Sequence, residues 1–151
     1  MKIAMGSDEA GFELKEILKE YLIKKGYEVE DYGVYDTQPV LYPDVAVKVA
    51  TAIAEGQHER GILICGTGIG MAIAANKVPG VRAAVCHDPY SAERARKSND
   101  AQIMTLGARV VGEELAQTLV SIWLAAEFQG GGSIPKVQQI NYYDQKYRSK
   151  I

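Results

Sequence analysis

One stretch in the middle of the chain constrains the fold more than any other. Residues 61–64 (Gly-Ile-Leu-Ile) form a short run of branched apolar side chains, which is typical of a strand buried on both faces. The run ends at Cys65 and continues into a glycine-rich turn over residues 66–70 (Gly-Thr-Gly-Ile-Gly). Good helix formers over residues 71–77 indicate that a helix follows. The stretch therefore predicts a strand–turn–helix unit of an α/β protein.

The rest of the chain repeats this alternation of strand and helix. Further strands are expected at residues 2–5, 27–32, 81–86 and 101–106. Helices are expected at residues 10–25, 42–55, 89–98 and 111–128, the last with Trp123 on its buried face. This order predicts a three-layer, Rossmann-like α/β fold, in which a five-stranded parallel sheet has helices on both faces. Residues 129–135 are expected to break regular structure, and residues 136–151 to form a short helix or an extended arm.

Size and charge narrow the class of protein. A chain of 151 residues is expected to form one domain that needs no metal or disulfide to support its core. The net charge of −2 argues against nucleic acid or an anionic membrane as the main partner. We expect no signal peptide and no membrane span, because no apolar run approaches about 18 residues. The two cysteines lack metal or disulfide spacing, which indicates a cytoplasmic protein with reduced thiols.

The glycine-rich turn has the chemistry of an anion site. Its backbone N–H groups are unobstructed by side chains, and the following helix adds partial positive charge. Such a turn suits a phosphate, a carboxylate or an oxyanion formed during a reaction. Cys65 lies at the carboxyl end of its strand, where nearby N–H groups would favour the thiolate. The alternative is that Cys65 is an inert buried side chain and the glycines only shape a loop.

Parallel strands end at one edge of a sheet, so we expect Asp8 and residues near His87 to approach Cys65. Asp8 follows the first strand as either a ligand or a helix N-cap. Thr67 is expected to donate to an oxyanion or to bond its own backbone. His87 has two interpretations, a site residue or a surface residue, and Arg109 is expected to hold an anion or to form a surface ion pair.

Two further polar residues are expected to be structural. Glu9 is interpreted first as a favourable charge in a helix's first turn. His58 lies in the polar segment Gln-His-Glu-Arg and is expected to be solvated.

Five motifs together resemble the ribose-5-phosphate isomerase B / galactose-6-phosphate isomerase family. They are residues 6–15 (GSDEAGFELK), 42–44 (YPD), 64–70 (ICGTGIG), 99–109 (from Asn-Asp to Leu-Gly-Ala-Arg) and 127–131 (EFQGG). The resemblance implies an isomerase domain over residues 1–140. The C-terminal extension, residues 141–151, is rich in tyrosine and is expected either to pack on a partner subunit or to form a frayed end. The resemblance also implies a homodimer or a dimer of dimers with active sites at the subunit interface. The implied reaction interconverts an aldose and a ketose, a sugar or sugar phosphate, through an enediolate without metal or cofactor.

The same resemblance assigns roles to residues. Cys65 would be the base that moves a proton between C1 and C2, with Thr67 assisting. Asn99 would reach the substrate from the partner chain, and Arg109 would bind its phosphate. The full set of implied substrate-binding residues is Asp8, Glu9, Tyr42, Gly66, Gly68, Ile69, Gly70, Ser98, Asn99, Arg109 and Lys136.

The chain departs from the family pattern where the substrate would be captured. Glu9 and Ser98 stand where the family has His, and the histidine implied to open the sugar ring is the one missing at position 98. Around the glycines the family has Gly-Gly-Arg-His and a second Arg four residues after the first. This chain has Gly131-Gly132-Ser133, and Lys136 stands at the second Arg position. One phosphate-binding Arg is lost and the other becomes a point charge without bidentate geometry.

Three hypotheses follow from these departures. The one we favour is an isomerase whose substrate differs from ribose 5-phosphate: an unphosphorylated sugar, or one whose open chain needs no ring-opening acid. His87 could supply the missing imidazole if it reaches the ring oxygen. The second is one subunit of a heteromeric sugar-phosphate isomerase. The third is a non-catalytic sugar-binding or regulatory module.

Overall fold

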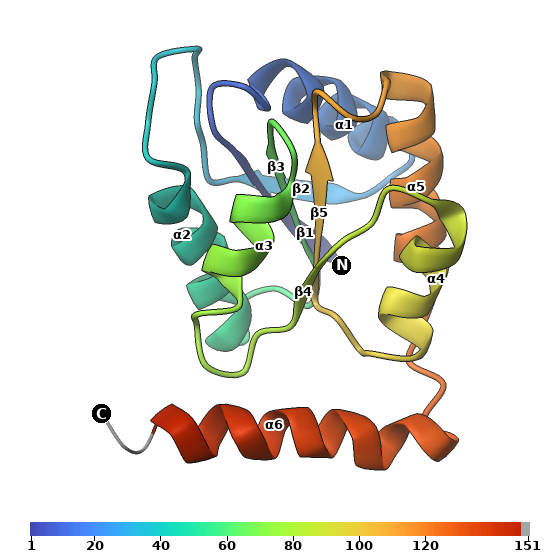
Figure 1. Ribbon diagram of the computed structural model, residues 1–151. Helices are drawn as coiled ribbons and strands as arrows, with labels where there is room; N and C mark the ends of the chain where they lie inside the picture. The colour runs from blue at the N-terminus through green and yellow to red at the C-terminus, as the bar shows by residue number, and fades with distance from the viewer. Residues whose placement is uncertain (149–151) are drawn as a thin grey trace.

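Five parallel strands form the central sheet, and the computed structural model describes it together with the rest of residues 1–148 (Figure 1). The strands are β1 (Lys2–Ser7), β2 (Glu28–Asp31), β3 (Gly61–Cys65), β4 (Ala83–Val85) and β5 (Ile103–Gly107). Their order is β2-β1-β3-β5-β4, and every neighbouring pair is parallel. All five residues of β3 are buried, as its apolar sequence predicts.

Helices cover both faces of the sheet. They are α1 (Phe12–Lys24), α2 (Tyr42–Ala54), α3 (Ile69–Ala75), α4 (Pro89–Lys97), α5 (Glu113–Ala125) and α6 (Ile134–Arg148). One core lies between the sheet and α1, α4 and α5, and it includes Leu18 and Trp123, which are both fully buried. The other lies under α2 and α3 and includes Val49 and Met71. The predicted three-layer α/β fold is therefore confirmed, with element ends shifted by a few residues.

The segment after α5 differs from its prediction. Residues 129–135 were expected to lack regular structure, but Gly131–Ser133 form a 3₁₀ helix and α6 begins at Ile134. Pro135 lies in the first turn of α6, where its missing N–H breaks no intrahelical hydrogen bond. Of the two forms considered for residues 136–151, the helix is observed, and it runs through the expected boundary at residue 140. The last three residues of that segment lie outside the described residues.

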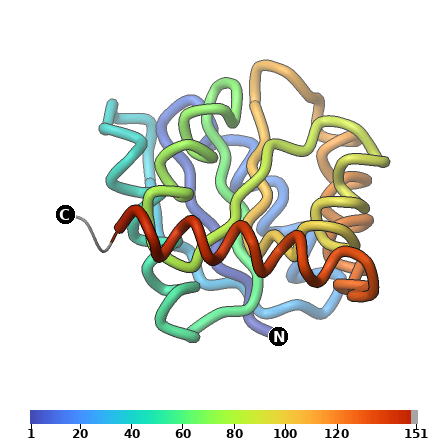
Figure 2. Tube along the Cα trace, turned by 60° about the horizontal axis from the view of Figure 1, so that its bottom comes forward, coloured from blue at the N-terminus to red at the C-terminus, as the bar shows by residue number. Residues whose placement is uncertain are grey.

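α6 lies apart from the layered body, across the edge at which the strands begin (Figure 2). Val137 is its buried residue. Near its end, the Arg148 guanidinium donates to the carbonyl oxygens of Asn76 and Lys77, at the end of α3. Asp144 accepts a hydrogen bond from the Gly80 amide at 2.7 Å. Polar contacts thus anchor α6 to the loop between α3 and β4.

His58 is buried, contrary to the prediction that it is solvated. Its Nε2 lies 2.7 Å from a Glu30 carboxylate oxygen and 2.8 Å from the Tyr32 hydroxyl. Its Nδ1 lies 3.0 Å from the carbonyl oxygen of Lys2. The polar residues around His58 in sequence suggested a surface loop, but the ring folds back between β1 and β2, where it finds polar partners.

A buried ion pair ties α1 to the end of β2. The Lys15 side chain is fully buried, and its Nζ donates to both carboxylate oxygens of Asp31, at 2.7 and 2.8 Å, and to the Val34 carbonyl. Lys19 adds a contact to Asp31 at 2.9 Å. Burial raises the pKa of Asp31, but hydrogen bonds from the two lysines and the backbone outweigh it, so the pKa lies below its ordinary value. The pair fixes the path of the loop between β2 and α2.

Replacing Asp31 with Asn leaves the Lys15 ammonium buried without its carboxylate, and we expect a loss of about 3 kcal/mol in the free energy of unfolding at pH 7. Because the pKa of Asp31 is depressed, this contribution is complete above the ordinary carboxyl pKa of about 3.9 and is lost as the pH falls below it. Urea unfolding of both proteins between pH 7 and pH 3 measures the difference.

The control is Glu20→Gln, which breaks the exposed Lys24–Glu20 pair and should cost less than about 0.5 kcal/mol. A difference between Asp31→Asn and the parent protein that stays constant down to pH 3 would show that ionised Asp31 is not the stabilising group.

Candidate active site

The Cys65 turn is shaped by its contact with the end of β5. Gly68 has φ +77°, and a Cβ there would lie 2.9 Å from the backbone of Leu106, so both conformation and space require glycine. Its carbonyl oxygen accepts a hydrogen bond from the Thr105 hydroxyl at 2.8 Å. Held in this way, the Gly68 amide donates to the Cys65 Sγ at 3.1 Å. An amide donor at the sulfur stabilises negative charge on it.

α3 begins two residues earlier than the sequence predicted, so Ile69 and Gly70 belong to its first turn. Thr67 is exposed, and its Oγ1 accepts from the Ile69 amide at 3.3 Å. The structure therefore shows the local backbone bond that was the alternative role of Thr67. A hydroxyl that accepts this bond still has its hydrogen to donate to a ligand.

Three side chains from other elements reach the turn. Asp8 follows β1, and its Oδ1 accepts from the Gly11 amide at 3.0 Å ahead of α1. The ring of Tyr42, the first residue of α2, lies where a Cβ on Gly70 would be. The Arg109 Nη1 lies 3.0 Å from the position of a Cβ on Gly66. The structure thus brings Asp8, Tyr42 and Arg109 to the Cys65 turn, where the sequence predicted Asp8 from the strand order and Tyr42 only by resemblance.

The electrostatics of Asp8 reflect its burial. Burial raises the pKa of its carboxyl above the ordinary value, against the lowering effects of the Gly11 amide and the Arg109 charge. The adjacent Glu9 has a different role: its Oε2 accepts from the Val40 amide at 3.1 Å. Glu9 thus holds the loop that leads into Tyr42, whereas Asp8 acts as a local cap that also faces the guanidinium of Arg109.

His87 lies at the same edge of the sheet and supports the end of β5. Its Nε2 accepts a hydrogen bond from the Gly107 amide at 2.9 Å. Gly107 packs against the backbone of Thr67, 2.7 Å from where its Cβ would be. Burial lowers the pKa of His87, opposed by the Asp88 charge. A neutral imidazole that accepts at Nε2 carries its proton on Nδ1.

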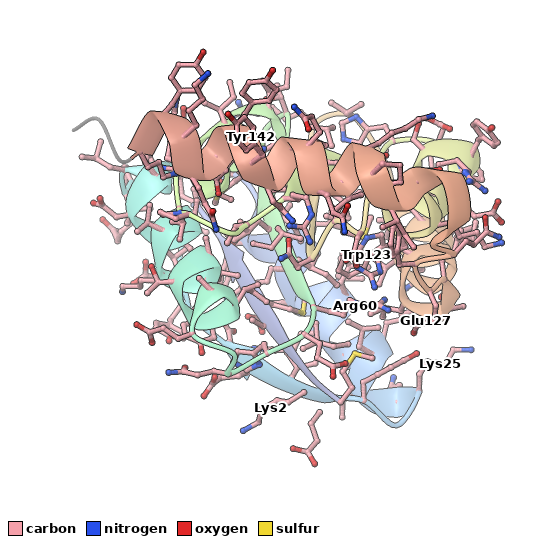
Figure 3. The ribbon with its side chains drawn as sticks, turned by 90° about the horizontal axis from the view of Figure 1, so that it is seen from below. Lys2, Lys25, Arg60, Trp123, Glu127 and Tyr142 are labelled. Carbon is pink, nitrogen blue, oxygen red and sulfur yellow. The ribbon has the colours of Figure 1, made fainter. Side chains whose placement is uncertain are left out.

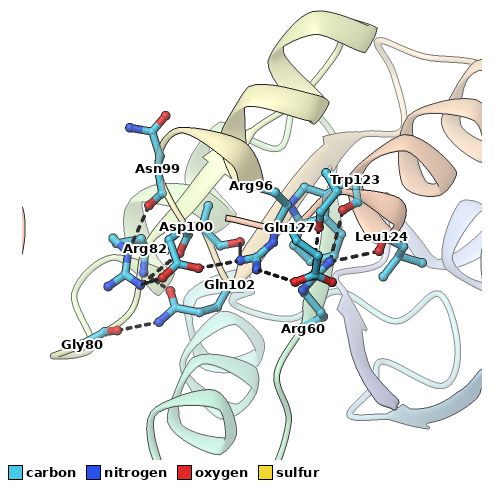
Figure 4. A network of polar contacts seen from close by, with 12 residues as sticks. Arg60, Gly80, Arg82, Arg96, Asn99, Asp100, Gln102, Trp123, Leu124 and Glu127 are labelled. Atoms are coloured by element: carbon cyan, nitrogen blue, oxygen red, sulfur yellow. Dashed lines mark hydrogen bonds and ion pairs between the residues drawn. The ribbon is translucent and has the colours of Figure 1, made fainter. Parts of the chain in front are cut away.

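The remaining predicted site residues lie at the opposite edge of the sheet. Ser98 and Asn99 follow α4 and precede β5, and Lys136 is exposed on α6. The Asn99 carbonyl accepts from Arg82 at 3.3 Å, while its side-chain amide points away from that cluster (Figure 4). The five-residue β5 separates the two edges by roughly 16 Å. A single chain therefore does not bring these residues to Cys65.

A buried arginine network, which sequence reasoning missed, supports this second group (Figures 3 and 4). The guanidinium of Arg60, 2% exposed, donates to the carbonyl oxygens of Trp123, Leu124 and Ala126 and to Glu127. Arg96 pairs with Asp100 at 3.1 Å, and Arg82 pairs with the same carboxylate at 3.5 Å. The i,i+4 spacing of Arg96 and Asp100 is a weak sequence signal for one of these pairs. Contacts between residues more than 60 positions apart in the chain, such as Arg60 with Trp123, leave no local signal in the sequence.

The Cys65 edge is open in a single chain. Thr67 and Ile69 are exposed, although Cys65 itself is only 5% exposed. Two hollows, of about 560 and 350 Å³, border α2, and neither has Cys65 or Asp8 in its lining.

Metal and membrane features are not found within residues 1–148. No group of three His, Cys, Asp or Glu side chains there could hold a metal ion. Over the same residues, each helix is too short or too polar to cross a membrane.

Comparisons with known proteins agree with this architecture. The model of the ribose/galactose isomerase family matches residues 3–140. The chain is 57% identical over 145 residues to a D-erythrulose-4-phosphate isomerase of Pectobacterium atrosepticum, covering 95% of each protein. It is 55% identical over 148 residues to a ribose-5-P isomerase B of Listeria innocua, covering 98% of this chain and 100% of that protein. The solved ribose-5-phosphate isomerase B of Clostridium thermocellum superposes with a TM-score of 0.96 at 52% identity, covering 97% of this chain and 99% of that one.

The hydrogen bond from Gly107 predicts how His87 titrates. We expect ¹⁵N NMR of the imidazole to show the Nδ1–H form and a pKa below 6.5, since protonation must break this bond. Because the pKa is depressed, the free energy of unfolding should fall as the pH drops below about 6.5. His87→Gln, whose carbonyl can also accept, should remove this pH dependence and keep the fold. His87→Ala should cost about 1–3 kcal/mol by leaving the buried Gly107 amide unpaired.

An Nε2–H tautomer, or equal stability of the Gln and Ala variants, would contradict this role for His87.

Proposed function

The chain belongs to the ribose/galactose isomerase family, and on that premise we propose that it interconverts the ketose and aldose forms of a small, open-chain sugar phosphate with Cys65 as the base. The observation that carries this proposal is the contact between the Cys65 sulfur and the Gly68 amide at 3.1 Å. A base and an amide donor at one turn are what proton abstraction next to a carbonyl requires.

The proposed reaction moves two hydrogens and needs no oxidant. Cys65 removes the C1 proton of the ketose. The charge that develops on oxygen is stabilised by backbone N–H groups of the turn other than those of Gly68 and Ile69, which donate to Cys65 and Thr67. The proton then returns to C2, while the hydroxyl hydrogen on O1 passes to O2. Thr67, whose Oγ1 already accepts from Ile69, donates a hydrogen bond to these oxygens during the transfer and keeps its proton. Asp8 and Tyr42 bind the sugar hydroxyls beside the turn.

The substrate we propose is a four-carbon ketose 4-phosphate. Ser98 stands where the family has the histidine implied to open the sugar ring, so that acid is missing from its family position. A tetrulose 4-phosphate needs none, because no hydroxyl of the ketose lies far enough from C2 to close a five-membered ring. In the aldose product the C4 oxygen could close such a ring on C1, but it carries the phosphate. D-Erythrulose 4-phosphate, the compound in the name of the Pectobacterium relative, has this property. The Listeria relative, nearly as similar, carries a pentose name, so Ser98 and not overall identity supports the choice.

We propose that two copies of the chain build each site. Ser98, Asn99 and Lys136 lie roughly 16 Å from the Cys65 edge, which is farther than a four-carbon substrate can bridge. We call the edge that holds Ser98, Asn99 and Lys136 the α4–α6 edge. A homodimer that places this edge of one chain against the Cys65 turn of the other brings both sets of site residues together. It also covers an open edge, and exclusion of water strengthens the electrostatic stabilisation of an enediolate.

Removing the proposed base gives the first test. Cys65→Ala should slow solvent-deuterium exchange into D-erythrulose 4-phosphate by about 10²- to 10⁴-fold, the usual contribution of a positioned general base. Cys86→Ala is the matched control, because that thiol is fully buried and burial raises its pKa to about 12. The control should lose some stability but keep exchange within a few fold. Exchange that survives in Cys65→Ala would remove Cys65 from its role.

Substrate choice gives the second test. The purified chain should show a higher kcat/KM for D-erythrulose 4-phosphate than for ribose 5-phosphate. Ser98→His should raise kcat/KM for ribose 5-phosphate by about tenfold or more, by supplying a ring-opening acid, with Ser98→Ala as the control that should not. Faster turnover of ribose 5-phosphate by the parent chain would overturn the tetrulose assignment. Activity that appears only with a second, unlike chain would indicate a heteromer. Binding of the sugar without deuterium exchange would indicate a non-catalytic module.

A further inference from the structure

The proposed substrate carries a phosphate, but the α4–α6 edge lacks the guanidinium groups that the family uses there. Lys136 stands at one such position, and the other, four residues earlier, is Gly132. A Cβ on Gly132 would have no atom within 4 Å, so the position opens onto free space. A planar guanidinium binds a phosphate through two parallel hydrogen bonds, which a lysine cannot reproduce. An arginine near this gap would supply those hydrogen bonds from the α4–α6 edge, in addition to Arg109 at the Cys65 edge.

Arg94 occupies that place. It lies on α4, one turn before Ser98, and its Nε donates to the Ser98 Oγ at 2.7 Å. Its Nη2 lies 3.4 Å from the side-chain oxygen of Gln129, directly before the three glycines. The guanidinium is thus held between the end of α4 and the glycine loop. The Ser98 contact fixes the plane of the group and uses only one of its five N–H donors.

The charge of Arg94 has no carboxylate partner among residues 1–148. Both of its hydrogen-bond partners, Ser98 and Gln129, are neutral. The acidic groups around it are paired with other cations. Glu93 pairs with Lys97 at 3.4 Å, Glu127 with Arg60 at 3.0 Å and Asp100 with Arg96 at 3.1 Å. Arg94 is therefore a positioned cation with donors left for an anion.

We propose that Arg94 binds the phosphate of the substrate whose carbon chain lies at the partner subunit's Cys65 turn. This inference rests on the proposed two-chain site and adds a specificity-determining residue to it. The serine at position 98 has two consequences here: it removes the ring-opening imidazole, and it orients the guanidinium through Nε. Arg94 thereby replaces the missing guanidinium at position 132, with Lys136 as a second positive charge.

The test compares a phosphorylated substrate with its unphosphorylated counterpart. Arg94→Gln should raise KM for D-erythrulose 4-phosphate about 10- to 100-fold, because it removes charge-assisted hydrogen bonds to the phosphate. The kcat at saturation and the kcat/KM for D-erythrulose itself should stay within a few fold of the parent values. Arg94→Lys should give an intermediate KM. The control is Lys97→Gln, which removes one positive charge from the same helix and should change KM less than about threefold.

Equal losses on both substrates would show that Arg94 only supports the fold, and an unchanged KM would exclude it from the phosphate site. Either result overturns this inference while the parent chain still exchanges deuterium into the tetrulose phosphate. Absence of that exchange in the parent chain is instead the failure of the proposed function.

Mixing two variants tests whether Arg94 acts across subunits. In a hybrid dimer of Arg94→Gln and Cys65→Ala, one site combines the intact Cys65 of the first chain with the intact Arg94 of the second. At a substrate concentration below the raised KM, the mixture should therefore be more active than either variant alone. A mixture that forms hybrid dimers but shows no gain would place Arg94 outside the partner's site.

Discussion

The site depends on the close contact between the Cys65 turn and the end of β5. Because Gly68 lacks a side chain, its backbone can lie against Leu106, and the Thr105 hydroxyl then holds its carbonyl. The peptide unit that contains this carbonyl also carries the Ile69 amide, which donates to the Thr67 hydroxyl. On the other side of the Gly68 Cα, the Gly68 amide donates to the Cys65 sulfur. Packing against the end of β5 thus fixes the residue whose amide faces the sulfur, and such a packed contact is stiffer than a free loop.

A second constraint acts at the opposite edge. Arg60 directly precedes β3, and its guanidinium donates to carbonyl oxygens at the end of α5. The last turn of a helix leaves such acceptors without intrahelical partners. Arg96 and Arg82 extend the network to Asp100, next to Asn99. Removing one member would leave a buried charge unpaired, so the network determines one arrangement of the end of α4. Ser98, Asn99 and Arg94 gain their positions from it.

The sequence was sufficient to predict the fold class because each strand and each helix has a local apolar pattern. That pattern is the same whatever the order of the strands in the sheet. It was also sufficient for the approach of Asp8 to Cys65, since parallel strands end at one edge. It was insufficient where the decisive partner is distant in the chain. The polar residues next to His58 in the sequence suggested that it is solvated, yet its buried ring forms hydrogen bonds with Glu30 and Tyr32. Pro135 and the glycines before it suggested a loop, yet α6 begins there, because a helix's first turn tolerates proline.

The separation of the two edges has a consequence for how such an enzyme changes substrate. The Cys65 turn keeps the family's motif, and the departures at Ser98, Gly132 and Lys136 fall at the far edge. Glu9 departs on the Cys65 side, where it holds the loop before Tyr42. Within one chain, changes roughly 16 Å from the Cys65 turn, in a separate hydrogen-bond network, couple weakly to the folding of that turn. In the proposed two-chain site, ring opening and phosphate binding would therefore change through Ser98 and Arg94 while the sulfur and its amide donor keep their geometry. With proton transfer and substrate capture on two edges that the proposed dimer joins, one would vary without loss of the other.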